Sequence, residues 1–129
     1  MKKPTISKLK KRADAIFSQY IRQKHAKNGQ LKCYTCDKVM EIKEAQNGHY
    51  IPRRHLATRY LEENCRPQCY RCNCILKGNY DEYSLRLMRE KGADILEILN
   101  SQKNTLKPMK IADYEELIFF YKNKLDMLK

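Results

Sequence analysis

Two Cys-x-x-Cys pairs constrain this 129-residue chain more than any other feature of its sequence. Cys33 and Cys36 form the first pair, Cys69 and Cys72 form the second, and 32 residues separate the two pairs. Four thiolates from two such pairs are the usual ligands of a closed, tetrahedral zinc site. The spacing therefore predicts a structural zinc ion that fastens two loops together and leaves no open position at which water could be activated.

Two further cysteines, Cys65 and Cys74, leave alternatives open. Cys65 could replace Cys69 as a ligand, although Cys69 and Cys72 have the better spacing for a zinc knuckle. A chain with six free, buried thiols is the other alternative. In a reducing cytoplasm, however, cysteines paired in this way favour a metal over disulfide bonds.

The net charge of +12 is concentrated at one end of the chain. Residues 1–32 hold ten Lys or Arg and one acid, Asp14, and so carry +9 of this total. Such a basic segment indicates a polyanionic partner, most simply DNA held through its phosphates, and a solvated lysine-rich helix face is the alternative. Its candidates for DNA binding are Lys8, Lys11 and Arg12.

The length of the chain suits one domain with a modest core that a bound metal would help to stabilise. No apolar run approaches the roughly 18 residues of a membrane span, and the basic N-terminus lacks the apolar region of a signal peptide. We therefore expect a cytoplasmic protein without a membrane partner.

Hydrophobic periodicity predicts a mainly helical α+β chain. The expected helices cover residues 5–27, about 70–76, 80–91, 94–101 and 111–128, and the expected strands lie near Leu31 and at 39–42, 49–52 and 64–68. Within a single expected domain, 1–129, we distinguish a basic N-terminal helix (1–29), a zinc-bound centre (30–80) and C-terminal helices (81–129). The apolar stripe of the final helix favours a core face over a base-stacking platform, and it could also serve a homodimer.

The segment between the cysteine pairs resembles the H-N-H (His-Me finger) nuclease motif. GHYIPR at 48–53 supplies the H-x-x-P that opens a first strand, and ENCRPQCYRCN at 63–73 supplies the N-x-x-x-x-C-x-x-C that closes a second strand and begins a helix. Over roughly residues 8–129, the chain carries in this order a basic helix, C-x-x-C, GHYIPR, R-Y-x-E-x-N, Q-C-x-x-C-N, K-G-N and a final Tyr/Leu/Lys-rich helix. This order is similar to that of the lambdoid phage NinG, or Rap, recombination protein family. The centre alone also resembles phage endonuclease VII. The resemblance implies a zinc-stapled ββα-metal core flanked by the N-terminal and C-terminal helices.

The resemblance also implies a role for each matching residue. His49 would be the general base that takes a proton from the attacking water, and Asn73 would bind one Mg²⁺ or Mn²⁺ through its amide oxygen. Asn64 would hold the loop and orient His49. The DNA backbone near the scissile phosphate would be gripped by Arg53, Arg54 and Lys77, and Arg59, in the basic loop with Arg53 and Arg54, is a further candidate for DNA binding.

One position departs from the motif. Many H-N-H enzymes place a metal-binding Asp or His directly before the base, and this chain has Gly48 there. A second ligand for the catalytic ion could then come from Asn47, His55 or Asn79, or a DNA phosphate could complete the shell.

These features favour a phage or prophage recombination endonuclease that acts in the bacterial cytoplasm on branched DNA, such as Holliday junctions or D-loops. The partners expected with it are DNA, phage recombination proteins and a second copy of the chain, since symmetric junction cutting needs two active sites. A non-catalytic zinc module that binds nucleic acid is the second hypothesis. A sequence-specific homing-type nuclease is the third, and the absence of a visible recognition module in the sequence argues against it.

Overall fold

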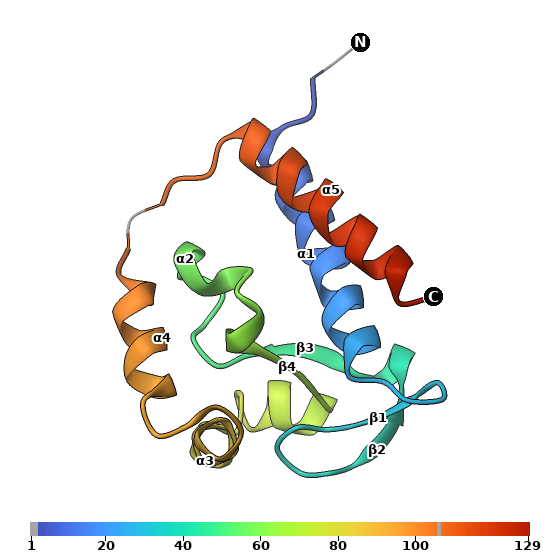
Figure 1. The fold of residues 1–129 in the computed structure, drawn as a ribbon, viewed down its shortest axis with the longest axis vertical. Helices are drawn as coiled ribbons and strands as arrows, with labels where there is room; N and C mark the ends of the chain where they lie inside the picture. Colours follow the sequence, from blue (N-terminus) through green and yellow to red (C-terminus); the bar gives the residue numbers. More distant parts are fainter. Residues whose placement is uncertain (1–2, 106) are drawn as a thin grey trace.

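The computed structural model describes residues 3–105 and 107–129. Met1 and Lys2 of the basic N-terminal segment, and Leu106 of the loop before the final helix, lie outside the described residues. The described chain is mainly helical with two small antiparallel sheets (Figure 1), which confirms the expected α+β class. In chain order its elements are α1 (Ile6–Lys24), β1 (Gln30–Lys32), β2 (Val39–Glu41), a 3-10 helix (Ile42–Glu44), β3 (Gln46–His49), α2 (Leu56–Arg59), a 3-10 helix (Glu62–Asn64), β4 (Cys65–Gln68), a π-helical segment (Arg71–Ile75), α3 (Tyr80–Lys91), α4 (Ile95–Lys103) and α5 (Ile111–Met127).

Helices α1 and α5 lie side by side although they come from opposite ends of the chain (Figure 1). Thr5 caps α1, because its hydroxyl accepts a hydrogen bond from the Lys8 amide at 3.2 Å. Apolar residues at helical spacing face each other across the pair, and the stripe predicted for the final helix is therefore a core face. These residues are Leu9, Ala13, Phe17, Tyr20 and Ile21 of α1, and Tyr114, Ile118, Tyr121 and Leu125 of α5.

Glu62 fastens this helix pair to the centre of the chain. Its carboxylate accepts hydrogen bonds from Lys24 of α1 at 3.0 Å and from Lys124 of α5 at 2.9 Å. Burial raises the pKa of Glu62, but the two ammonium groups outweigh this effect and hold the pKa below its usual value. The two helices consequently form one wall beside β3 and β4.

Strands β3 and β4 pair antiparallel, with His49 opposite Cys65 (Figure 1). The expected strand at 49–52 is wrong by three residues, because β3 begins at Gln46 and ends at His49. Its end has a local cause: the buried Asn64 side chain accepts a hydrogen bond from the Ile51 amide and donates one to the Ile51 carbonyl, so Ile51 cannot continue the ladder.

The other expected elements lie close to their observed bounds. The hairpin β1–β2 carries the first cysteine pair, and α3 spans the residues expected for it. The expected helix near 70–76 is a π-helical segment, and the short α2 and the two 3-10 helices were not expected. No helix in the part of the chain that the structure describes is long and apolar enough to cross a membrane.

Candidate active site and metal centre

The fold brings the four predicted thiols together. Cys33 follows β1, Cys36 lies in the turn of the hairpin, Cys69 follows β4, and Cys72 belongs to the π-helical segment. Their sulfur atoms all lie within 4.8 Å of one another, and three of the four residues are buried. This arrangement confirms that the two pairs meet and that they are positioned to bind one metal ion.

The turn of the first knuckle explains how the first pair is shaped. The Cys33 amide donates to the Lys38 carbonyl at 2.8 Å, and the Asp37 amide donates to the Cys33 carbonyl at 3.0 Å. Asp37 takes a left-handed conformation with φ of 67°, which Asp tolerates better than most residues. Both sulfurs of the pair therefore turn toward the second knuckle.

The electrostatics of the cluster fit a divalent cation. Burial raises the pKa of Cys33, but hydrogen bonds from the Cys69 backbone and from Thr35 outweigh it and lower that pKa to about 6. Burial and the neighbouring thiols raise the pKa of Cys36 to about 12. Thiols this close cannot all ionise unless a cation compensates their charge, and zinc is the ion that four soft sulfur donors favour.

The two remaining cysteines lie outside this cluster. Cys65 is fully buried against Phe17 and Tyr121 in the core beneath α1 and α5, where burial raises the pKa of its thiol. Cys74 is exposed, and its thiol donates to Gln46 Oε1 at 3.2 Å. The alternative in which Cys65 replaces Cys69 is therefore wrong for this fold.

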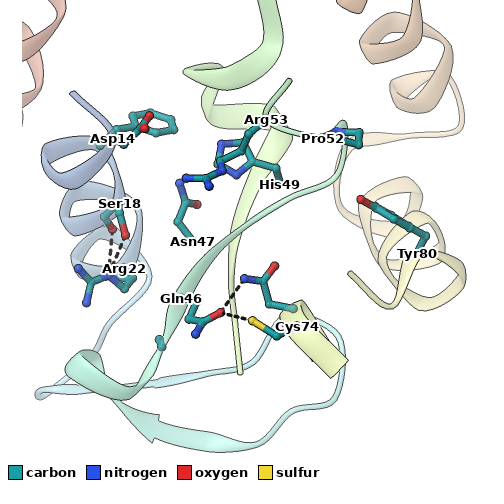
Figure 2. A pocket seen from close by; sticks show the side chains of 13 residues that line it. Asp14, Ser18, Arg22, Gln46, Asn47, His49, Pro52, Arg53, Cys74 and Tyr80 are labelled. Carbon is teal, nitrogen blue, oxygen red and sulfur yellow. Dashed lines mark hydrogen bonds between the residues drawn. The ribbon is translucent and has the colours of Figure 1, made fainter. Parts of the chain in front are cut away.

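A cleft of about 640 Å³ lies between α1, β3 and the π-helical segment (Figure 2). His49, Asn47 and Arg53 lie at one end of the cleft, and Gln46 and Cys74 lie at the other. Asn73 also lines it, so the fold gathers the predicted base and the predicted metal ligand around the same space. The cleft is separate from the thiol cluster, although Asn73 directly follows Cys72 of that cluster.

The His49 ring is held in one tautomer. Its Nε2 lies 2.9 Å from the carbonyl oxygen of Arg59. A carbonyl only accepts hydrogen bonds, so Nε2 must carry the proton and Nδ1 of the neutral ring must carry the lone pair. Nδ1 has no hydrogen-bond partner among residues 3–105 and 107–129, which leaves it available to take a proton.

The surroundings of His49 keep the ring neutral at pH 7. Burial lowers its pKa to about 4, and the positive charges of Arg53 and Arg59 act in the same direction. The hydrogen bond to the Arg59 carbonyl and the charge of Asp14 oppose this shift without reversing it. His49 is therefore in the form that a general base requires.

Asn64 organises the loop that follows His49. Its fully buried side chain donates to the carbonyl oxygens of Ile51 at 3.0 Å and Thr58 at 3.1 Å, and it accepts from the Ile51 amide at 2.7 Å. It makes no hydrogen bond to the His49 ring. Because Thr58 precedes the residue whose carbonyl holds His49, Asn64 acts on the ring through the loop backbone.

Gly48 has no room for a side chain. A Cβ at this position would lie 1.9 Å from Gln68 Oε1 and 2.6 Å from Gln68 Cδ. The Gln68 side chain is itself fully buried, and it donates to Thr35 Oγ1 at 3.1 Å and to the Gly78 carbonyl at 2.9 Å. The place where the H-N-H motif has an Asp or His is therefore filled by Gln68, for which the resemblance to that motif predicts no role.

The three residues considered as a second metal ligand lie in different parts of the fold. His55 lines a different groove with Arg54 and Lys103, and Asn79 donates toward the Thr35 carbonyl and Cys72 Sγ at the zinc end. Asn47 lines the cleft, and its Oδ1 is buried without a hydrogen-bond partner among the described residues. His55 and Asn79 are thus not among the residues that line the cleft with His49.

The basic residues expected to bind DNA fall into two groups. One group is exposed and consists of Lys8, Lys11, Arg12, Arg53, Arg54 and Lys77. Arg59 is different, because its guanidinium bonds both carboxylate oxygens of Asp14 and also the Arg53 carbonyl, and only 11% of the side chain is exposed. Its contact with DNA stays a prediction, but this geometry gives Arg59 a structural role.

Comparison with known proteins identifies one family. The family model described as Bacteriophage Lambda NinG protein matches residues 2–129, which is nearly the whole chain. Searches of the curated proteins and of the solved structures gave no match.

Proposed function

The chain belongs to the NinG family of bacteriophage proteins, and from this premise we propose that it is a recombination endonuclease that hydrolyses phosphodiester bonds in branched DNA. The enzyme is encoded by a phage or prophage and acts in the bacterial host. Its core is of the H-N-H type, with one site for structural zinc and a separate site for chemistry.

The hydrogen bond from His49 Nε2 to the Arg59 carbonyl is the single observation that supports catalysis best. It leaves Nδ1 as the proton acceptor on a ring that is neutral at pH 7. His49 lines the same cleft as Arg53, whose guanidinium would hold a phosphate beside the base.

In the proposed reaction, His49 Nδ1 takes a proton from a water molecule as the water oxygen attacks the phosphorus. The bond from phosphorus to the 3′ oxygen breaks, and this oxygen leaves with a proton from solvent. Arg53 holds the phosphate at the mouth of the cleft. Asn73 would hold a Mg²⁺ or Mn²⁺ ion through its amide oxygen, and that ion would stabilise the charge that develops on the phosphate and on the 3′ oxygen.

The zinc site serves as scaffold in this proposal. Cys72 and Asn73 are neighbours, so an ion held by the four thiols also fixes the position of the Asn73 amide. Four sulfur ligands leave zinc no open position, and the zinc therefore takes no part in activating water.

A cleavage assay with matched linear, forked and four-way DNA tests the proposal. Wild-type protein should cut the branched substrates in the presence of Mg²⁺ or Mn²⁺, and His49→Ala should slow cutting by roughly 10²- to 10⁴-fold. Zinc content and circular dichroism of the variant should match those of the wild type. His25→Ala, which changes a histidine at the end of α1 outside the cleft, is the matched control and should cut normally.

Two results would contradict parts of the proposal. If His49→Ala cuts as fast as the wild type, then His49 is not the base. If the wild type binds branched DNA but cuts none of the substrates with either ion, then the non-catalytic nucleic-acid-binding function takes its place.

A further inference from the structure

We propose that Gln46 is the second protein ligand of the catalytic divalent ion, in the place of the side chain that Gly48 lacks; this assignment rests on the proposed nuclease function. The two ligands from the chain are then the side-chain oxygens of Gln46 and Asn73, both of which line the cleft with His49.

The alternation of side chains along β3 selects Gln46. Side chains two residues apart in a strand point to the same face, so Gln46 shares a face with Gly48, and Asn47 shares the opposite face with His49. Asn47 accordingly lies beside the Cys65 thiol. Because Gln68 fills the space over Gly48, Gln46 is the next position on that face that can present an oxygen.

The distance between the two amides fits a pair of ligands on one ion. In the structure, Asn73 Nδ2 donates to Gln46 Oε1 at 2.7 Å. A half-turn of the Asn73 carboxamide exchanges its nitrogen for its oxygen and brings two oxygens to nearly this separation. Two adjacent oxygens on an octahedral Mg²⁺, each about 2.1 Å from the ion, lie about 3 Å apart. Without a cation the two oxygens would repel each other.

Gln46 Oε1 also accepts a second hydrogen bond, from a thiol. The Cys74 thiol donates to it at 3.2 Å, and Cys74 is exposed, so the thiol can turn into solvent when a cation takes its place. The Gln46 oxygen thus accepts from one amide and one weak thiol donor, and an ion would take the place of both.

The charge around this pair predicts how tightly the ion binds. Asp14 is the one acid among the residues that line the described cleft, and Arg59 and Tyr60 already bond its carboxylate. The ligands that remain are neutral amides, whereas Mg²⁺ sites usually include one or two carboxylates. Binding is therefore weak in the free protein, and a carboxylate placed at position 46 should strengthen it.

Titration of Mn²⁺ into zinc-loaded protein, followed by the electron paramagnetic resonance signal of free Mn²⁺, tests the assignment without any cleavage. Gln46→Ala should weaken Mn²⁺ binding by about tenfold or more, and Gln46→Glu should strengthen it by a similar factor. Asn47→Ala removes an amide of the same strand and the same cleft but from the opposite face, and it should leave the affinity unchanged. Zinc content and circular dichroism should be the same in all variants.

The possible results separate this assignment from the proposed function. Equal affinities for wild type, Gln46→Ala and Gln46→Glu would overturn the assignment, as would a loss of binding in Asn47→Ala alone. Absence of Mn²⁺ binding in both the wild type and Gln46→Glu would overturn it as well. If branched DNA is still cut with Mn²⁺ in any of these cases, the nuclease function stands and only the ligand assignment fails.

Discussion

The thiol cluster and the cleft are adjacent in sequence at Cys72 and Asn73, yet they are opposite kinds of site. The cluster has four soft donors, three of them in buried residues, and their sulfur atoms lie within 4.8 Å of one another, positioned to bind one metal ion. The cleft has hard, neutral donors and a histidine with a free lone pair.

In the proposed enzyme, one short segment would serve stability and chemistry together. A closed site stabilises the fold because every ligand is used, whereas a reactive site must leave some groups unsatisfied until substrate arrives. The π-helical segment joins the two, because it carries both Cys72 of the thiol cluster and Asn73 of the cleft. The following predictions test this contrast, from the largest expected effect to the smallest.

Removal of one zinc ligand should destroy both sites. Cys69→Ser should lose zinc and most of the cooperative fold, because structural zinc contributes on the order of 10 kcal/mol. Zinc content and thermal unfolding by circular dichroism measure the effect. Cys74→Ser, in the same segment but outside the cluster, should keep both. A stable Cys69→Ser protein without metal would refute the four-thiolate site.

A side chain at Gly48 should damage the cleft while sparing zinc. Gly48→Ala places a Cβ against the buried Gln68 side chain, and we expect a loss of about 1–3 kcal/mol in the free energy of unfolding. Urea unfolding measures this loss. In a Gln68→Ala background the same substitution should cost much less, and an equal cost in both backgrounds would show that Gln68 is not the obstacle.

The pH dependence of stability should report on the buried His49. Its pKa is about 4 in the folded chain and 6.5 in the unfolded chain, so between these values the unfolded chain binds the proton. Stability should therefore fall as the pH drops from 6.5 toward 4, by at most about 1.4 kcal/mol per pH unit.

His49→Gln isolates this effect from protonation of the zinc thiolates, which weakens both proteins in acid. Urea unfolding of the two proteins at pH 7 and pH 5 should show a steeper loss for the wild type. Equal losses would mean that His49 titrates normally in the folded chain.

The exposed cations of α1 should affect DNA affinity and leave both sites intact. Replacing Lys8, Lys11 and Arg12 with Ala should weaken binding to linear and branched DNA alike, and it should reduce the slope of log affinity against log salt by about 0.9 per lost phosphate contact. Lys38→Ala, at an exposed position of the zinc hairpin, is the control. An unchanged salt slope would show that α1 does not meet DNA.

Local patterns predicted much of this protein. The spacing of Cys33, Cys36, Cys69 and Cys72 was enough to identify the cluster, because a knuckle is defined within four residues. Helical periodicity identified the buried face of α5 and the full span of α3. The H-x-x-P sequence identified His49 as the residue to examine.

Other features depend on contacts between distant residues. The sequence alone predicts that Arg59 is a DNA-binding cation. In the fold, Asp14, 45 residues away in sequence, forms a hydrogen bond with the Arg59 guanidinium. Gln68 matters because its side chain lies over Gly48. Gln46 matters because its side chain contacts Asn73, which is 27 residues away in the sequence. No local pattern contains such pairs.

The sequence by itself determined the four thiols of the cluster, the amphipathic helices and the family, since each depends on residue type and spacing along the chain. Only the tertiary structure decided which nitrogen of His49 is free, why position 48 is glycine and which side chain stands beside Asn73. These features depend on contacts between β3, β4, the π-helical segment and the loop that contains Arg59. Such contacts form only when the chain packs, because these segments are distant from one another in the sequence.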